Sequence, residues 1–177
     1  MKKIVRYIIG IVFSMLLFTV SGCIDLRTEE EIVDEMVTEL ITSLDSKDKD
    51  KIKSLFANGK INDINNFDQS IDKLLNYYDG TYVSKVDGGK ATYRDKHYDH
   101  QAGWYELSYD VTTTCDVYRI AVHWCTEYTT DSDMIGIWSF YIIKMSDDST
   151  PEYSYRGDGL WTPGINIGKV YTKDEKE

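Results

Sequence analysis

The chain has 177 residues, 42% of them hydrophobic and 28% charged, and its 20 Lys and Arg against 30 Asp and Glu leave a net charge of −10 at pH 7. This length suits one domain with a single core. The acidic balance argues against a nucleic-acid partner, because phosphate recognition needs clustered Lys and Arg. It also argues against adhesion of the protein surface to anionic lipid headgroups, and its simplest role is solubility.

The N-terminus carries a targeting pattern. Three basic residues, Lys2, Lys3 and Arg6, precede an apolar run over residues 8–20. A charged start, a short apolar stretch and small residues before a cleavage point are typical of a secretory signal peptide. The apolar run is shorter than the about 20 residues that a membrane-spanning helix requires. We therefore predict a cleaved signal peptide over residues 1–22.

The stretch Val20-Ser21-Gly22-Cys23 resembles the lipobox of bacterial lipoproteins. The resemblance implies that Cys23 receives a diacylglycerol and becomes the mature N-terminus, on the outer face of the cell membrane. The predicted partner is the lipid bilayer itself. Each acyl-chain methylene that is buried in it contributes about 0.8 kcal/mol to the free energy of membrane binding. Loss of residues 1–22 removes three basic residues and no acidic ones, so the net charge of the mature chain falls from −10 to −13.

Apolar residues at helical spacing predict three helices after a short linker over residues 23–27. The first spans 28–45 and begins with a capping box formed by Thr28 and Glu31. A shorter second helix is capped by Ser46 or Asp48 and ended by Asn58-Gly59. The third spans about 66–78.

From residue 81 the period changes to two, which predicts β-strands. The segment 90–103 is polar without a clear period and predicts a loop, and 170–177 predicts a disordered charged tail. The expected strands cover 81–86, 104–113, 118–128 and 134–145, with a short one near 165–167.

Helices followed by a curved antiparallel sheet of four or five strands make an α+β fold over one domain, 28–169, with the helices on one face. The order of elements resembles the cone-shaped, nuclear-transport-factor-2-like (cystatin-like) fold, which polyketide-cyclase-like proteins share. The stretches 74–80, 136–144 and 157–165 are similar to a family of uncharacterised lipoproteins from Gram-positive bacteria. That resemblance supports the expected fold, carries over no established activity and leaves the function open.

The hairpin between the two long strands suggests an acid/base site. If its turn spans residues 114–117, His123 lies opposite Ser108, with Glu106 and Asp110 as diagonal neighbours. Diagonal Cβ atoms lie roughly 7–8 Å apart, so a carboxylate–imidazole pair is conceivable. The alternative is that these polar side chains form the solvent-facing side of a half-exposed sheet.

The same register separates the remaining cysteines. It places Cys115 in the turn and Cys125 opposite Glu106, roughly 30 Å away along the strands. A disulfide needs Cα atoms within about 7 Å, so we predict two free thiols. His97 and His100, with His123 and Cys125, do not have the spacing of a zinc site. We expect no metal and no cofactor.

The aromatic content is high, with 14 Tyr and four Trp. Large aromatic side chains outside the cell line ligand pockets or stack on sugars, but they also fill the concave side of a bent sheet. The candidate pocket residues are Trp104, Tyr105, Trp124, Trp138 and Tyr141.

Three hypotheses for function stay open at this point. The first is a non-enzymatic binding domain for a small molecule or an envelope protein, with its site between helices and sheet. The second is a small isomerase- or cyclase-like enzyme that uses His123 with Glu106 or Asp110. The third is a structural or interaction protein of the envelope whose own aromatic side chains fill the pocket.

Overall fold

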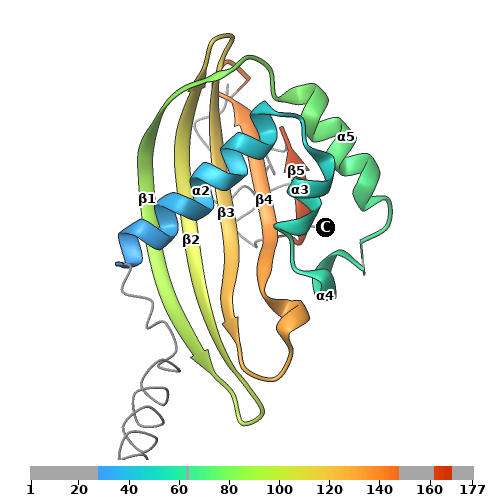
Figure 1. Ribbon diagram of the computed structural model, residues 1–177, viewed down its shortest axis with the longest axis vertical. Helices are drawn as coiled ribbons and strands as arrows, with labels where there is room; N and C mark the ends of the chain where they lie inside the picture. The colour runs from blue at the N-terminus through green and yellow to red at the C-terminus, as the bar shows by residue number, and fades with distance from the viewer. Residues whose placement is uncertain (1–27, 63, 148–161, 169–177) are drawn as a thin grey trace, which may run out of the picture. The chain divides into compact units, whose positions relative to one another are not determined.

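A computed structural model describes residues 28–62, 64–147 and 162–168 (Figure 1). The predicted signal peptide, Cys23, Trp161 and the charged tail lie outside these residues. By their internal contacts the described residues divide into two units, with the division between residues 37 and 38. The predicted α+β class, with helices preceding the strands, is confirmed.

The first helix, α2 (Glu29–Asp45), begins as predicted, because Thr28 Oγ1 accepts a hydrogen bond from the Glu31 amide at 3.2 Å. Helix α3 (Lys49–Ser54) is capped by Asp48, whose side chain accepts from the Lys51 amide. Helix α5 (Phe67–Tyr77) matches the third prediction.

The predicted end of the second helix is wrong. Helix α3 stops at Ser54, and a separate short helix, α4 (Asn58–Ile61), follows. The reason is a backbone contact with the sheet: Phe56 forms an isolated parallel bridge with Ile137, and the Ala57 amide donates to the Ile137 carbonyl at 3.1 Å. Extended backbone at this contact interrupts the helix, so the helical period alone could not place its end.

The sheet has the order β1-β2-β3-β4-β5. Neighbouring strands are antiparallel except β4 and β5, which run parallel, so the expectation of a fully antiparallel sheet is wrong. The chain between β4 and β5 is long enough for the crossover that parallel strands need. The strands are β1 (Tyr82–Lys96), β2 (Gln101–Thr113), β3 (Val117–Tyr128), β4 (Gly136–Lys144) and β5 (Gly164–Ile167).

The predicted loop over 90–103 is also wrong. Most of it is the second half of β1 and the start of β2, joined by a tight hairpin after Lys96. Strand β1 lies at the edge of the sheet, and its side chains are exposed along most of its length. Such a strand is held by backbone pairing and needs no apolar alternation. The apolar period therefore could not predict its second half.

The core lies on the sheet face that carries Leu107, Val111 and Ile120. Tyr118 shares this face, and its hydroxyl donates to the Tyr77 carbonyl at 3.0 Å while its ring packs 5.0 Å from that of Tyr78. The end of α5 therefore packs on this face, which we call the helix-facing side. The other side is called the opposite face.

The register of the β2–β3 hairpin differs from the predicted one by two residues. Tyr118 pairs with Val111, and His123 pairs with Glu106. The turn closes earlier because Thr113 Oγ1 accepts from the amides of Cys115 and Asp116, at 3.2 and 3.0 Å. A shift of two residues keeps each side chain on its predicted face.

Candidate functional site

A buried polar row crosses the opposite face of the sheet. Glu106 of β2 pairs directly with His123 of β3, which pairs with Ser139 of β4. Their side chains are 7%, 9% and 0% exposed. Burial of a carboxyl group and an imidazole carries a desolvation cost that a solvent-facing strand avoids. The alternative interpretation, in which this face is simply solvent-exposed, is therefore wrong for Glu106 and His123, and also for Ser108, which is 1% exposed.

Asp110 does not belong to this row. It pairs with Arg119, which holds its carboxylate in a two-pronged ion pair with distances of 2.9 and 3.0 Å. The predicted register made Asp110 a diagonal neighbour of His123, and the observed register moves it further along the strand. The carboxylate next to His123 is that of Glu106.

Aromatic rings surround the imidazole. His123 Nε2 and the Tyr93 hydroxyl form a hydrogen bond of 2.6 Å. The Trp104 ring stacks on His123 with centroids 4.6 Å apart, and the Trp138 ring meets Trp104 edge to face at 4.4 Å. Each such aromatic pair contributes about 0.5–1.5 kcal/mol beyond its buried area. We call Tyr93, Trp104, His123 and Trp138 the aromatic cluster.

The two tryptophans of the cluster differ in their hydrogen bonding. Trp138 Nε1 donates to the Met134 carbonyl at 2.7 Å. Trp104 is 7% exposed, and its Nε1 has no hydrogen-bond partner among the described residues. A buried donor without an acceptor costs about 1–3 kcal/mol. An acceptor atom supplied by a bound molecule would remove that cost.

A positive charge lies next to the cluster. Lys60 of α4 is half-buried, and its Nζ lies 3.8 Å from the centroid of the Trp138 ring. This is a close cation–π contact. In the described part of the chain, no carboxylate forms an ion pair with Lys60. The ammonium is thus a second donor that a ligand could reach.

The five predicted pocket residues do not form one site. Trp104 and Trp138 come together in the aromatic cluster. Tyr105 and Trp124 pair with each other, and strand alternation places them on the helix-facing side. Tyr141 shares the face of the cluster but lies further along β4, where its hydroxyl accepts from the Thr162 amide.

Tyr93 and Lys60 were missed by the sequence reasoning. Tyr93 fell in the segment predicted to be a loop, and only the continuation of β1 brings it opposite Trp104. Lys60 comes from α4, which was not expected as a helix. No local pattern marks either residue, because both reach the cluster through tertiary contacts.

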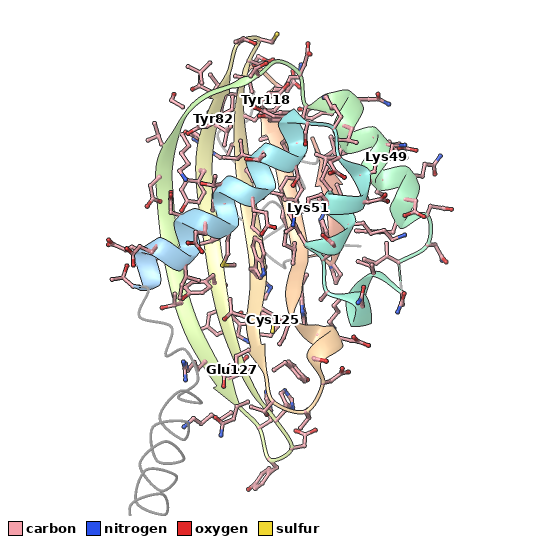
Figure 2. The ribbon with its side chains drawn as sticks, viewed as in Figure 1. Lys49, Lys51, Tyr82, Tyr118, Cys125 and Glu127 are labelled. Carbon is pink, nitrogen blue, oxygen red and sulfur yellow. The ribbon has the colours of Figure 1, made fainter. Side chains whose placement is uncertain are left out.

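Cys125 lies on β3 (Figure 2), where it pairs with Trp104 of the cluster and is fully buried, while Cys115 is exposed. Both thiols are free, as predicted. Burial raises the pKa of Cys125 to about 11, so its thiol is protonated at neutral pH. A protonated, buried thiol is neither a good nucleophile nor a ready metal ligand.

His97, His100, His123 and Cys125 do not form one cluster. His97 and His100 stack on each other with centroids 4.7 Å apart, and His100 also stacks on Tyr128 at 4.6 Å. Within residues 28–62, 64–147 and 162–168, no three His, Cys, Asp or Glu side chains lie close enough to hold a metal ion.

Two surface grooves border the helices of the unit 38–177. One, of about 210 Å³, lies between α3 and α5 beside the Lys53–Asp68 ion pair. The other, of about 130 Å³, lies between the end of α2 and the start of β1, where Asp45 accepts from the Tyr82 amide at 2.9 Å. Neither groove includes a residue of the aromatic cluster.

A comparison with family models finds the domain of unknown function DUF5104 over residues 39–145. The chain belongs to this family. The DUF5104 match runs from α2 through β4, so it contains the whole aromatic cluster together with Glu106 and Lys60. Comparison with curated proteins gives no match. Among the described helices, none combines the length and the apolar content needed to cross a bilayer.

Proposed function

We propose that this chain is a lipid-anchored, extracytoplasmic binding domain without catalytic activity. Its tether is acylated Cys23, as the lipobox-like sequence suggests, and its place is the outer face of the cell membrane. The α+β architecture with helices before the strands is compatible with a nuclear-transport-factor-2-like cone, which we include in the proposal. Its ligand, a small molecule or a segment of an envelope protein, binds at the aromatic cluster.

The observation that carries this proposal is the buried indole N–H of Trp104 without an acceptor among the described residues. Natural proteins rarely leave such a group unsatisfied, and each case asks for an explanation. A ligand with an acceptor oxygen provides one. The cluster is not fully closed, because Tyr93 is 37% exposed and Trp138 is half-buried, and such aromatic side chains suit a ligand with an apolar or sugar-ring face.

We expect a Trp104→Phe substitution to weaken ligand binding by about tenfold or more, because it removes the donor and keeps most of the ring. The measurement is thermal unfolding of the protein with neutral sugars, carboxylates and small amides. A ligand at a hundred times its Kd adds about 2.7 kcal/mol, or roughly 5–10 °C for a domain of this size.

Trp124→Phe is the matched control, since Trp124 is equally buried but lies on the helix-facing side. It should leave the ligand-induced shift in melting temperature intact. If no compound in the panel stabilises the protein, or if Trp104→Phe retains the full shift, the binding proposal is wrong. The first of these results would favour the structural role in the envelope, with the cluster as simple packing.

A specific observation also favours the enzymatic alternative. Glu106 lies directly opposite His123, and Tyr93 hydrogen-bonds its Nε2. A buried carboxyl–imidazole–phenol set can move protons in an isomerase- or cyclase-like reaction. Under this alternative, His123→Gln should lower turnover of an identified substrate by at least about a hundredfold, with unchanged thermal unfolding as the folding control. Full activity of the variant would remove the alternative.

A further inference from the structure

Strand β1 forms an open edge of the sheet. The sheet order places it outermost, next to β2 only. Large hydrophobic side chains are exposed along it: Tyr82 by 38%, Val83 by 58%, Val86 by 64% and Tyr93 by 37%. In Figure 1, β1 is the long green strand at the left of the sheet. An exposed edge of this length is a template for a further strand.

The hydrogen bonds at the hairpin show which backbone groups of β1 point outward. The His97 amide donates to the His100 carbonyl at 2.9 Å, so His97 faces β2. Gln101, the partner of Lys96, instead exchanges hydrogen bonds with Thr129 on its other side. Because antiparallel pairing alternates, the N–H and C=O groups that point away from β2 belong to Lys90, Thr92, Arg94 and Lys96.

These same four residues share one face of the sheet, and three of them are basic. Arg94 makes a 3.7 Å ion pair with Glu127 of β3 (labelled in Figure 2), and the Arg94 side chain remains 75% exposed. Lys90 and Lys96 are exposed, and neither forms an ion pair with a carboxylate in the described ranges. Lys90, Arg94 and Lys96 therefore form a basic stripe along the open edge of β1, on a chain whose net charge is −10.

We propose that this stretch of β1, residues 90–96, binds an extended acidic segment of a partner protein, which adds a strand to the sheet. Main-chain hydrogen bonds would supply affinity, and alternate side chains would supply specificity. On the basic face, carboxylates of the added strand lie beside Lys90, Arg94 and Lys96. On the other face, its alternate residues lie beside Tyr93, so these residues are apolar.

A second copy of the chain fits this edge poorly. Antiparallel pairing of the stretch with itself about Tyr93 would place Lys90 opposite Lys96 and Thr92 opposite Arg94. Like charges directly opposite each other destabilise a strand pair, and lysines on an edge are a common defence against self-pairing. An acidic strand converts the same charges into favourable pairs.

The test uses the full-length chain in detergent and three labelled synthetic peptides. The first alternates Glu and Val, the second alternates Lys and Val, and the third is the first with alternate backbone amides methylated. Fluorescence anisotropy should show that the Glu–Val peptide binds at least about tenfold more tightly than either of the others. Its binding should weaken with added salt.

Two variants locate the binding. Thr92→Pro removes an outward donor without breaking a hydrogen bond to β2, so it should weaken Glu–Val peptide binding about tenfold or more. The double variant Lys90→Glu, Lys96→Glu should prefer the Lys–Val peptide. Lys73→Glu, on the exposed side of α5, is the charge control and should change nothing. Thermal unfolding checks that each variant is folded.

This inference would be overturned if the Lys–Val peptide or the methylated peptide bound as tightly as the Glu–Val peptide. Unchanged binding by Thr92→Pro, or a dimer in sedimentation measurements that excludes the peptide, would also overturn it. Because Trp104→Phe should leave peptide binding intact, failure here is distinguishable from failure of the proposed ligand site.

Discussion

Replacement of Gly136 by alanine is expected to destabilise the protein by about 3 kcal/mol or more. Gly136 begins β4 with φ +132, in a region that L side chains rarely adopt. A Cβ there would lie 2.6 Å from the Ala57 amide nitrogen and 2.8 Å from the Phe56 carbonyl carbon. These are backbone atoms, and the Ala57–Ile137 hydrogen bond holds them against β4, so they cannot move aside cheaply.

Urea unfolding followed by circular dichroism measures this effect as a lower midpoint at unchanged slope. Gly103→Ala is the matched control, because Gly103 is also a buried strand glycine but lacks a left-handed backbone. Its added Cβ would lie 3.3 Å from Glu127 Cβ and 3.4 Å from Thr126 Oγ1, which are side-chain atoms, and should cost less than about 1 kcal/mol. Equal midpoints for the two variants would show that the contact between Phe56–Ala57 and β4 is not rigid.

Substitution of Cys23 by serine is expected to move the protein from the membrane fraction to the soluble fraction of cells that express it natively. The physical reason is that serine lacks the thiol that would carry the lipid, and stable anchoring needs the two acyl chains. Fractionation followed by immunoblotting measures the distribution, and mass spectrometry of the N-terminal peptide measures the modification.

Cys115→Ser controls for the loss of a thiol, because Cys115 is exposed and free in the β2–β3 turn. It should leave the protein in the membrane fraction. If Cys23→Ser stays with the membrane, or if the wild-type N-terminal peptide carries no lipid mass, the lipoprotein part of the proposal is wrong.

Local patterns in the sequence predicted the elements whose side chains face a core. Helix α5 was found because Phe67, Ile71, Leu74 and Leu75 recur on one stripe, and all four are buried. Strands β2, β3 and β4 were found with nearly correct bounds because burial imposes a period on them. The edge strand β1 was found only in part, because its second half, residues 90–96, is exposed and carries no apolar alternation.

Of the candidate site, the sequence predicted only residues that lie on β2, β3 and β4. Trp104, Glu106, His123 and Trp138 stood out by residue type, but their partners did not. The hairpin register depends on a side-chain hydrogen bond of Thr113, and it decides that Glu106 rather than Asp110 faces His123. A shift of two residues in register keeps the same side chains on each face, so the alternation in the sequence cannot distinguish the two registers.

The amino-acid sequence by itself therefore determined the fold class, most helices and strands, the free thiols and the prediction of a lipid-bearing N-terminus. These follow from local spacing and residue chemistry. Only the tertiary structure decided the parallel pairing of β5, the extent of β1 and the meeting of Tyr93, Trp104, His123 and Trp138. Such contacts join distant segments through backbone pairing and ring packing, which leave no periodic trace along the chain.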